Sequence, residues 1–124
     1  MPEQRGREHH YERVADGLRD ELSAMLEGEL GDPRIGLASV TEVHLAPDGK
    51  SARVYVSVVG DDAEAERTLE GLRAAKGYIR REVGARLGMV RPPELVFQID
   101  RSQEYSTRIE ELLGRTKKRK KKQQ

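Results

Sequence analysis

Cationic side chains gather where two predicted helices meet. The segment from Arg67 to Arg91 holds seven Lys/Arg and only two Glu, and small residues interrupt it at Ala75 and Gly77. We interpret these two residues as a kink between two helices, because a bend without large side chains lets another backbone come close. A helix that starts there also offers free N–H groups to an anion. The pattern indicates binding of a nucleic-acid backbone rather than catalysis.

The cations on both sides of the bend are the candidate contacts. If the helical phase continues through the kink, Arg73, Lys76 and Arg80 lie on one stripe, because they are spaced i, i+3, i+7. The alternative is a basic solvated helix face whose small residues only allow close helix packing. Tyr78 is the one aromatic residue at the bend, and we expect it to be half buried in the core rather than a platform for a base. The residues predicted to bind nucleic acid here are Arg73, Lys76, Gly77, Arg80, Arg81, Arg86 and Arg91.

The C-terminal end carries a second concentration of positive charge. Residues 115–124 hold seven Lys/Arg and no acid, whereas residues 1–114 hold 16 Lys/Arg and all 22 Asp/Glu, so the tail is +7 and the rest −6. A block of like charges repels itself, and we predict a disordered tail. It either tethers a polyanion through counterion release, which we favour, or only aids solubility. The tail residues predicted to contact nucleic acid are Lys117, Lys118, Arg119, Lys120, Lys121 and Lys122.

The composition argues against several other classes of protein. The chain has no Cys and three His, and we find no nucleophile, base and orienting group in a pattern typical of an enzyme. We therefore expect no catalytic residue, no metal and no cofactor. The sequence has no apolar run of about 20 residues and no apolar signal region at the N-terminus. These features predict a cytoplasmic protein that does not enter a membrane.

Apolar periodicity predicts the elements that position the kink. Residues 1–10 are polar and expected to be flexible, and the spacing of Leu18, Leu22 and Met25 then predicts a long helix. Two strands follow in 35–45 and 52–58. The turn signals between them predict an antiparallel hairpin.

The second half of the chain alternates helix and strand. An Asp-rich turn before residue 63 caps the helix that leads to the kink, and Gly88 ends the helix after it. Leu95, Phe97 and Ile99 alternate with polar or exposed positions and predict a third strand. Residues 107–114 predict a short final helix with a capping box at its start.

These elements make one domain over residues 11–114, with the order α-β-β-α-α-β. We predict an α+β fold in which helices cover one face of a three-stranded sheet; the strand order stays open. Asp32, Pro33 and Arg34 form the corner between the first helix and the first strand. Arg34 could contact RNA, but we favour a structural turn in which Arg34 pairs with the end of the helix.

In this order and spacing, the segments resemble the bacterial ribosome-binding factor A family. The resemblance covers most of residues 11–113. The segments that carry it are Arg13–Leu22, Glu29–Gly36, Val40–Val43, Ala46–Asp48, Ala52–Val58, Ala75–Arg80 and Pro93–Asp100.

The resemblance implies a KH-like (type II) fold with Ala-x-Gly at the kink in place of the Gly-x-x-Gly loop of ordinary KH domains. At the bend this chain has Ala75, Lys76 and Gly77. It also implies a monomeric assembly factor that binds the free small (30S) ribosomal subunit. Such a factor assists late maturation and 5′-end processing of 16S rRNA, and the family is linked to growth in the cold.

Two other classes remain as alternatives. A general KH-type protein would bind many RNAs through the same kink, and the absence of Gly-x-x-Gly at the bend argues against it. A DNA-associated protein would use the basic tail, but no recognition helix supports that interpretation.

Overall fold

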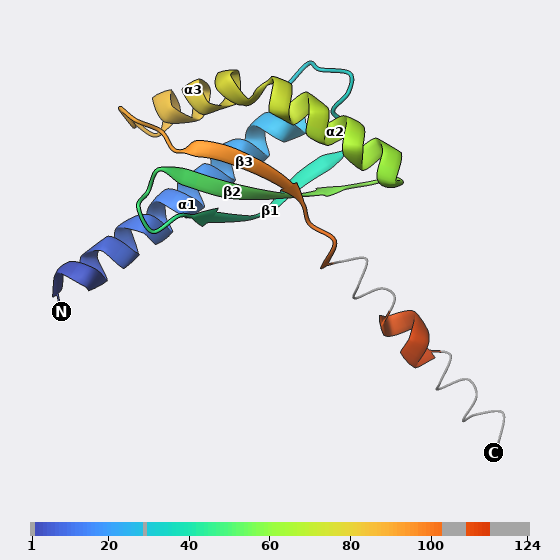
Figure 1. Cartoon of the computed structure of the whole chain (residues 1–124), viewed down its shortest axis with the longest axis horizontal. Coiled ribbons are helices and arrows are strands. Elements are labelled where there is room, and N and C mark those ends of the chain that lie inside the picture. Colours follow the sequence, from blue (N-terminus) through green and yellow to red (C-terminus); the bar gives the residue numbers. More distant parts are fainter. Residues whose placement is uncertain (1, 29, 103–108, 115–124) are drawn as a thin grey trace.

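The chain begins with one long helix. The computed structural model describes residues 2–28, 30–102 and 109–114, and α1 spans Pro2–Gly28 (Figure 1). Leu18, Leu22 and Met25 are fully buried on one stripe of α1, as their spacing predicted. The helix begins earlier than the apolar pattern indicated. Pro suits a first helical position, and the Glu, Gln and Arg that follow favour helix without a buried partner.

Three strands form the sheet. They are β1 (Ala38–Leu45), β2 (Ser51–Val58) and β3 (Glu94–Ile99), in the order β1-β2-β3. β1 and β2 pair antiparallel across a turn in which Gly49 has φ +72°, a conformation that favours glycine. β2 and β3 pair parallel. A parallel pair needs a long crossover, and the two helices between β2 and β3 supply it.

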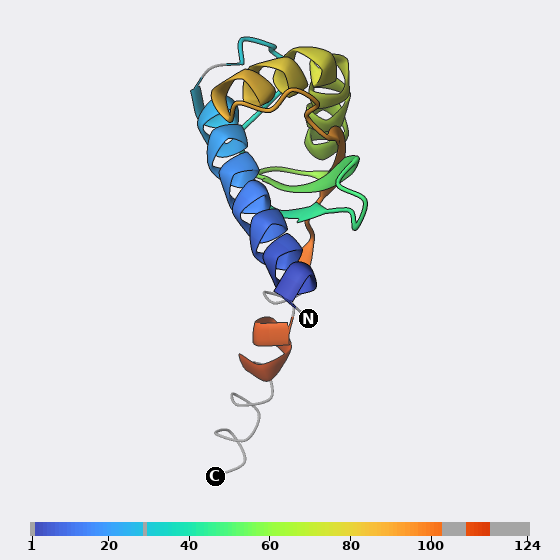
Figure 2. The ribbon, with the colours of Figure 1, turned by 90° about the vertical axis from the view of Figure 1, so that its left-hand side faces the viewer.

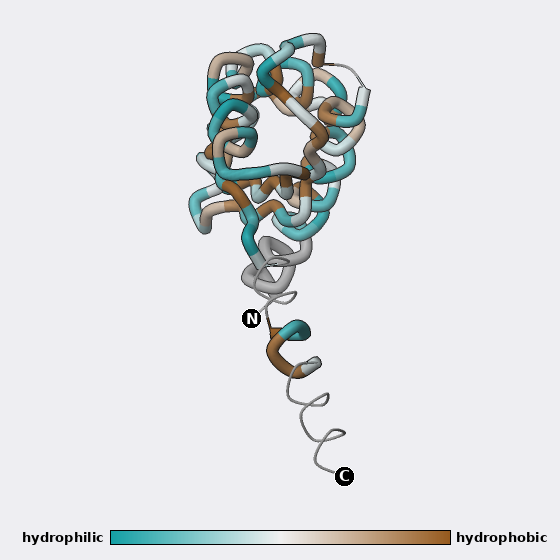
Figure 3. Tube along the Cα trace, turned by 90° about the vertical axis from the view of Figure 1, so that its right-hand side faces the viewer, coloured by the Kyte–Doolittle hydropathy of each residue, from teal (hydrophilic) through white to brown (hydrophobic). Residues whose placement is uncertain are grey.

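Helices cover one face of this sheet, as predicted. Ala52, Val54 and Val56 alternate along β2 and are buried, and Leu95 and Phe97 do the same along β3. Figure 2 shows α1 running beside the sheet with its C-terminal end near α3, and Figure 3 shows hydrophobic and hydrophilic residues intermingled along the trace of the domain. The opposite face carries the exposed and half-buried positions between them, most of which are polar. The core therefore lies between the sheet and the three helices.

A side-chain hydrogen bond links Asp100, the residue after β3, to β1. Thr41, at a bulge in β1, donates a hydrogen bond to Asp100 (Oγ1–Oδ2 2.5 Å), and the Ser102 N–H donates to the same carboxylate (2.9 Å). These hydrogen bonds lower the pKa of Asp100. Residues 109–114 are helical, in agreement with the predicted final helix. The predicted cap at Thr107 and the basic tail lie outside the described residues.

The corner after α1 is closed by a local ion pair. The Asp32 carboxylate accepts hydrogen bonds from the Arg34 backbone N–H (2.9 Å), Nε (3.0 Å) and Nη2 (2.6 Å). The Arg34 guanidinium thus has the structural role that we favoured, but its partner is Asp32 in the same turn and not the end of the helix. These hydrogen bonds lower the pKa of Asp32 from 3.8 to about 2.

This pair makes a testable pH prediction. Because the folded-state pKa is depressed, the stabilisation from the pair is complete above pH 3.8 and is lost as the pH falls through about 2. We expect the Asp32 carboxyl signal to titrate near pH 2 by NMR. Arg34→Gln should move the midpoint back toward 3.8, whereas Arg19→Gln on α1 should not. A midpoint near 3.8 in the unsubstituted protein would contradict the pairing.

Candidate nucleic-acid interface

The two helices of the crossover meet at a single residue. α2 spans Asp62–Ala74 and α3 spans Lys76–Arg86, and Ala75 between them has φ −87° and ψ 0°. The Ala75 N–H donates to Gly71 O (3.0 Å), and its own carbonyl accepts from the Ile79 N–H (2.9 Å). One residue thus ends one helix and begins the next, at the predicted kink. The only Gly-x-x-Gly spacing in the sequence, Gly28 to Gly31, begins at the last residue of α1 and lies outside the kink.

The two helix starts differ in charge. α2 is capped by Asp61, whose carboxylate accepts from the Glu64 N–H (2.9 Å), and its first turn also contains Asp62 and Glu64. α3 has no side-chain cap and no acid in its first turn. The positive end of a helix dipole attracts negative charge. α2 supplies that charge from its own sequence, whereas α3 has no side-chain acceptor of its own at its start.

Gly77, in the first turn of α3, has no structural need to be glycine. Its φ is not positive, and a Cβ added there would meet no atom within 4 Å. Helix packing therefore does not require a small residue at this position. This observation argues against the alternative in which the small residues of the kink serve only close packing.

A pocket of about 440 Å³ opens beside Gly77. We call it the kink pocket; it is lined by Gly77, Arg80, Arg81, Val90, Arg91 and Pro92. α3 contributes the first three of these residues, and the loop before β3 contributes the others. Four of the residues predicted from sequence are thus brought together. The lining contains three guanidinium groups and no carboxylate, so the pocket suits a phosphate.

The three arginines have different roles in the kink pocket. Arg80 donates from Nε (3.0 Å) and Nη2 (2.7 Å) to the Pro92 carbonyl, which ties the loop to α3. Arg81 and Arg91 are exposed, and within the described part of the chain no ion pair involves them. Arg80 therefore shapes the pocket, while Arg81 and Arg91 are available to a ligand.

The other predicted contacts are arranged differently from the expected stripe. Lys76 pairs with Glu94 on β3 (Nζ–Oε1 2.8 Å), and this hydrogen bond lowers the pKa of Glu94. Arg86 lies 3.3 Å from a Glu21 carboxylate oxygen on α1 and so links the two helices. Arg73 is exposed at the end of α2. The predicted stripe of free cations was thus only partly right. Lys76 and Arg80 donate hydrogen bonds to acceptors from distant segments and are not free.

Tyr78 lies beside the kink pocket without lining it. Tyr78 is 48% exposed and is not among the residues that pack against the core, so the expectation of a half-buried core residue was wrong. No ring contact involves Tyr78 among the residues that the structure describes.

Gly84 and Pro92, whose contact the sequence reasoning missed, fix the position of the loop between α3 and β3. The Met89 N–H donates to Gly84 O (2.8 Å), the Gly88 N–H donates to Ala85 O (3.3 Å), and Gly88 has φ +65°, a pattern that ends α3 in a left-handed residue. Pro92 packs directly on Gly84: an added Cβ would lie 2.9 Å from Pro92 Cγ. The signal available in the sequence was a glycine inside a helix. Glycine lowers the stability of a helix, so its presence there indicates that another segment packs closely against it.

We expect Gly84→Val to push the Pro92 loop away from α3. A proline ring cannot turn aside as a flexible side chain can, so the substitution overpacks the contact and lowers the free energy of unfolding by about 1–3 kcal/mol. Chemical denaturation measures this loss. The control is Ala85→Val at an exposed position of α3, which also introduces a valine but adds two methyl groups on the side that faces solvent. Equal denaturation midpoints for the two variants would contradict the proposed packing.

In the described part of the chain, no group of three or more His, Asp or Glu could hold a metal ion. No helix there has both the length and the apolar character needed to cross a bilayer.

Comparison with known proteins identifies the family to which the chain is similar. Residues 10–113 match the model of the family described as ribosome-binding factor A. The ribosome-binding factor A of Koribacter versatilis (strain Ellin345) is 58% identical over 119 residues, which cover 96% of this chain and 97% of the relative. A protein of the same name from Desulfitobacterium hafniense is 43% identical over 105 residues, covering 85% and 84%.

Solved structures of ribosome-binding factor A proteins also match this chain. The crystal structure of ribosome-binding factor A from Thermus thermophilus matches 72% of this chain and 94% of its own, with a TM-score of 0.63 and 28% identity. A model of the Thermus thermophilus protein fitted into a cryo-EM map of a 30S complex matches 68% and 89%, with a TM-score of 0.57 and 30% identity. Sequence, fold and relatives agree, and the chain belongs to the ribosome-binding factor A family.

Proposed function

We propose that this chain binds the free small (30S) ribosomal subunit and that the kink pocket contacts its rRNA. The single observation that carries the proposal is the pocket itself, where two exposed arginines and the uncapped start of α3 converge. It lies in a body whose net charge over residues 1–114 is −6, so the positive surface is local. The Thermus thermophilus relative fitted into a 30S complex supports the choice of partner.

Recognition in this proposal depends on shape and phosphates. Folded RNA presents phosphates and unstacked bases in fixed positions rather than a linear code. The kink pocket offers guanidinium groups to a phosphate, and Gly77 lets the backbone of the RNA come close to the start of α3. The basic tail, residues 115–124, adds a less specific attraction.

The biological role that we propose follows the family resemblance. The chain acts in the cytoplasm as a monomer, without catalysis of its own, and assists late maturation of 16S rRNA, including processing at the 5′ end. Growth in the cold depends on it. By occupying an unfinished subunit, it holds RNA segments in place while they mature.

A cell-based experiment tests this role. In cells that lack the protein, we expect 16S precursors with unprocessed 5′ ends to accumulate at low temperature, as measured by primer extension. The unsubstituted gene restores processing, and a gene with Arg81→Glu and Arg91→Glu does not. Normal 5′ ends in the deletion strain would refute the maturation role.

Gly77 gives a sharper test of the kink. Gly77→Ala should raise the free energy of unfolding by up to about 1 kcal/mol, because alanine favours helix and the space is empty. The same substitution should weaken 30S binding several-fold, because the added methyl lies where RNA approaches. Denaturation and subunit-binding assays measure the two effects separately. A variant that is more stable and binds unchanged would show that nothing approaches Gly77.

A further inference from the structure

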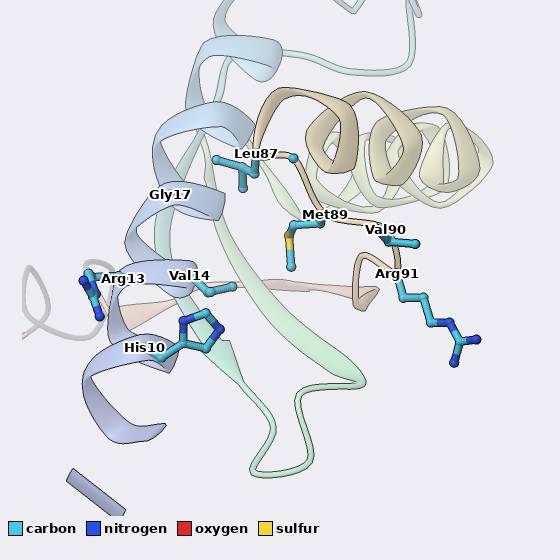
Figure 4. A pocket seen from close by; sticks show the side chains of 9 residues that line it. His10, Arg13, Val14, Gly17, Leu87, Met89, Val90 and Arg91 are labelled. Carbon is cyan, nitrogen blue, oxygen red and sulfur yellow. The ribbon is translucent and has the colours of Figure 1, made fainter. Parts of the chain in front are cut away.

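A second pocket adjoins the kink pocket. It also measures about 440 Å³ and lies between α1 and the loop that follows α3. We call it the α1 pocket. The residues that line it include His10, Val14, Leu87, Met89, Val90 and Arg91. In Figure 4, His10 and Val14 reach from α1 toward Met89 on the facing loop, while Arg13 and Arg91 extend outward at the edges.

The lining of the α1 pocket combines apolar walls with positive edges. Val14, Leu87 and Met89 form the apolar part, and no carboxylate lines the pocket. A nucleobase has an apolar face that stacks on such walls, and a methionine sulfur contacts aromatic rings favourably. The volume falls within the roughly 300–1,000 Å³ of small-ligand sites. The chemistry suits a flat aromatic group attached to a negative charge.

The two pockets share part of their lining. Val90 and Arg91 contribute to both, and the Val90 side chain is 96% exposed between them. An RNA strand that crosses this loop can therefore place a phosphate between Arg81 and Arg91 and direct the adjacent base toward Met89. Continuity with the kink pocket favours RNA over a protein segment as the occupant.

We propose that the α1 pocket holds one unstacked base of the rRNA whose backbone lies in the kink pocket. This inference rests on the proposed binding to the small subunit. It adds a stacking contact to a surface that otherwise contacts only phosphates, and so gives the protein a means to distinguish an unpaired nucleotide from a paired one.

Chemical footprinting tests the proposal on intact 30S subunits. The subunits are saturated with the full chain and treated with base-specific reagents that together report all four bases. We expect at least one base to be protected by the unsubstituted protein and exposed again with Met89→Asp, with about a tenfold loss of affinity. The control is Val96→Asp, a partly exposed valine on the open face of the sheet. It should keep the footprint and the affinity.

A second pair of variants guards against misfolding of Met89→Asp. His10→Ala removes a ring from the pocket, and His44→Ala removes an exposed ring on β1. We expect only His10→Ala to expose the same base. If neither pocket variant changes the footprint, or if the pocket crosslinks to a ribosomal protein instead, the inference is overturned. If the unsubstituted protein leaves no footprint, the proposed function fails with it.

Discussion

Replacing Arg81 and Arg91 together with glutamate weakens binding to 30S subunits by about 100-fold at physiological salt. These two guanidinium groups face the kink pocket, and in the described residues they form no ion pair that would hold them in the fold. Reversal turns two attractions for phosphate into two repulsions. Because neither residue is buried, the free energy of unfolding should stay nearly unchanged. Equilibrium binding to purified subunits measures the effect.

The matched control reverses the same amount of charge elsewhere. Arg19→Glu with Arg67→Glu changes the net charge equally, and both residues are exposed on helices and outside the two pockets. We expect this variant to bind within a few-fold of the unsubstituted protein. The salt dependence adds a second criterion: the slope of log affinity against log salt should shrink by about two for the pocket variant. Equal losses for both variants would mean that only net charge matters.

The largest effect on stability is expected from Ile79→Ala. Ile79 is fully buried on α3, one position before the arginines of the kink pocket. Truncating a buried isoleucine removes its burial and leaves a cavity, which costs about 2–5 kcal/mol. That is a large part of the roughly 5–15 kcal/mol typical of a domain. Urea denaturation should show a lower midpoint with an unchanged slope.

Tyr78→Ala is the control for this substitution. It removes a larger side chain from the neighbouring position, but that side chain is 48% exposed. We expect a loss of about 1 kcal/mol, smaller than that of Ile79→Ala, because less surface leaves the core. A larger loss for Tyr78→Ala than for Ile79→Ala would show that the tyrosine, rather than the isoleucine, anchors α3.

Local patterns were sufficient to predict most of the fold. The stripe of Leu18, Leu22 and Met25 indicated α1, and the alternation in residues 52–58 indicated a half-buried strand, because both patterns follow from the period of the backbone itself. The kink was predicted from another local pattern: the small residues Ala75 and Gly77 interrupt an otherwise helical sequence. The start of α1 at Pro2 was missed, since no apolar period marks it.

The details of the site depend on contacts between distant segments. Lys76 pairs with Glu94, and Arg80 binds the carbonyl of Pro92. Neither partner is near in sequence, so charge spacing alone suggested a stripe of free cations. The parallel pairing of β2 with β3 brings these partners to α3, and the strand order was not predictable from local pattern. The contact of Gly84 with Pro92 has the same origin.

We propose that the folded domain, rather than the basic tail, recognises the small subunit. Sucrose-gradient sedimentation with cell extract tests it most directly, with the full chain compared with a version that ends at Gly114. We predict that both forms migrate with free small subunits and not with translating ribosomes. If the shortened form no longer follows the subunit while the full chain binds RNA indiscriminately, recognition lies in the tail. The alternative of a general RNA-binding protein would then stand.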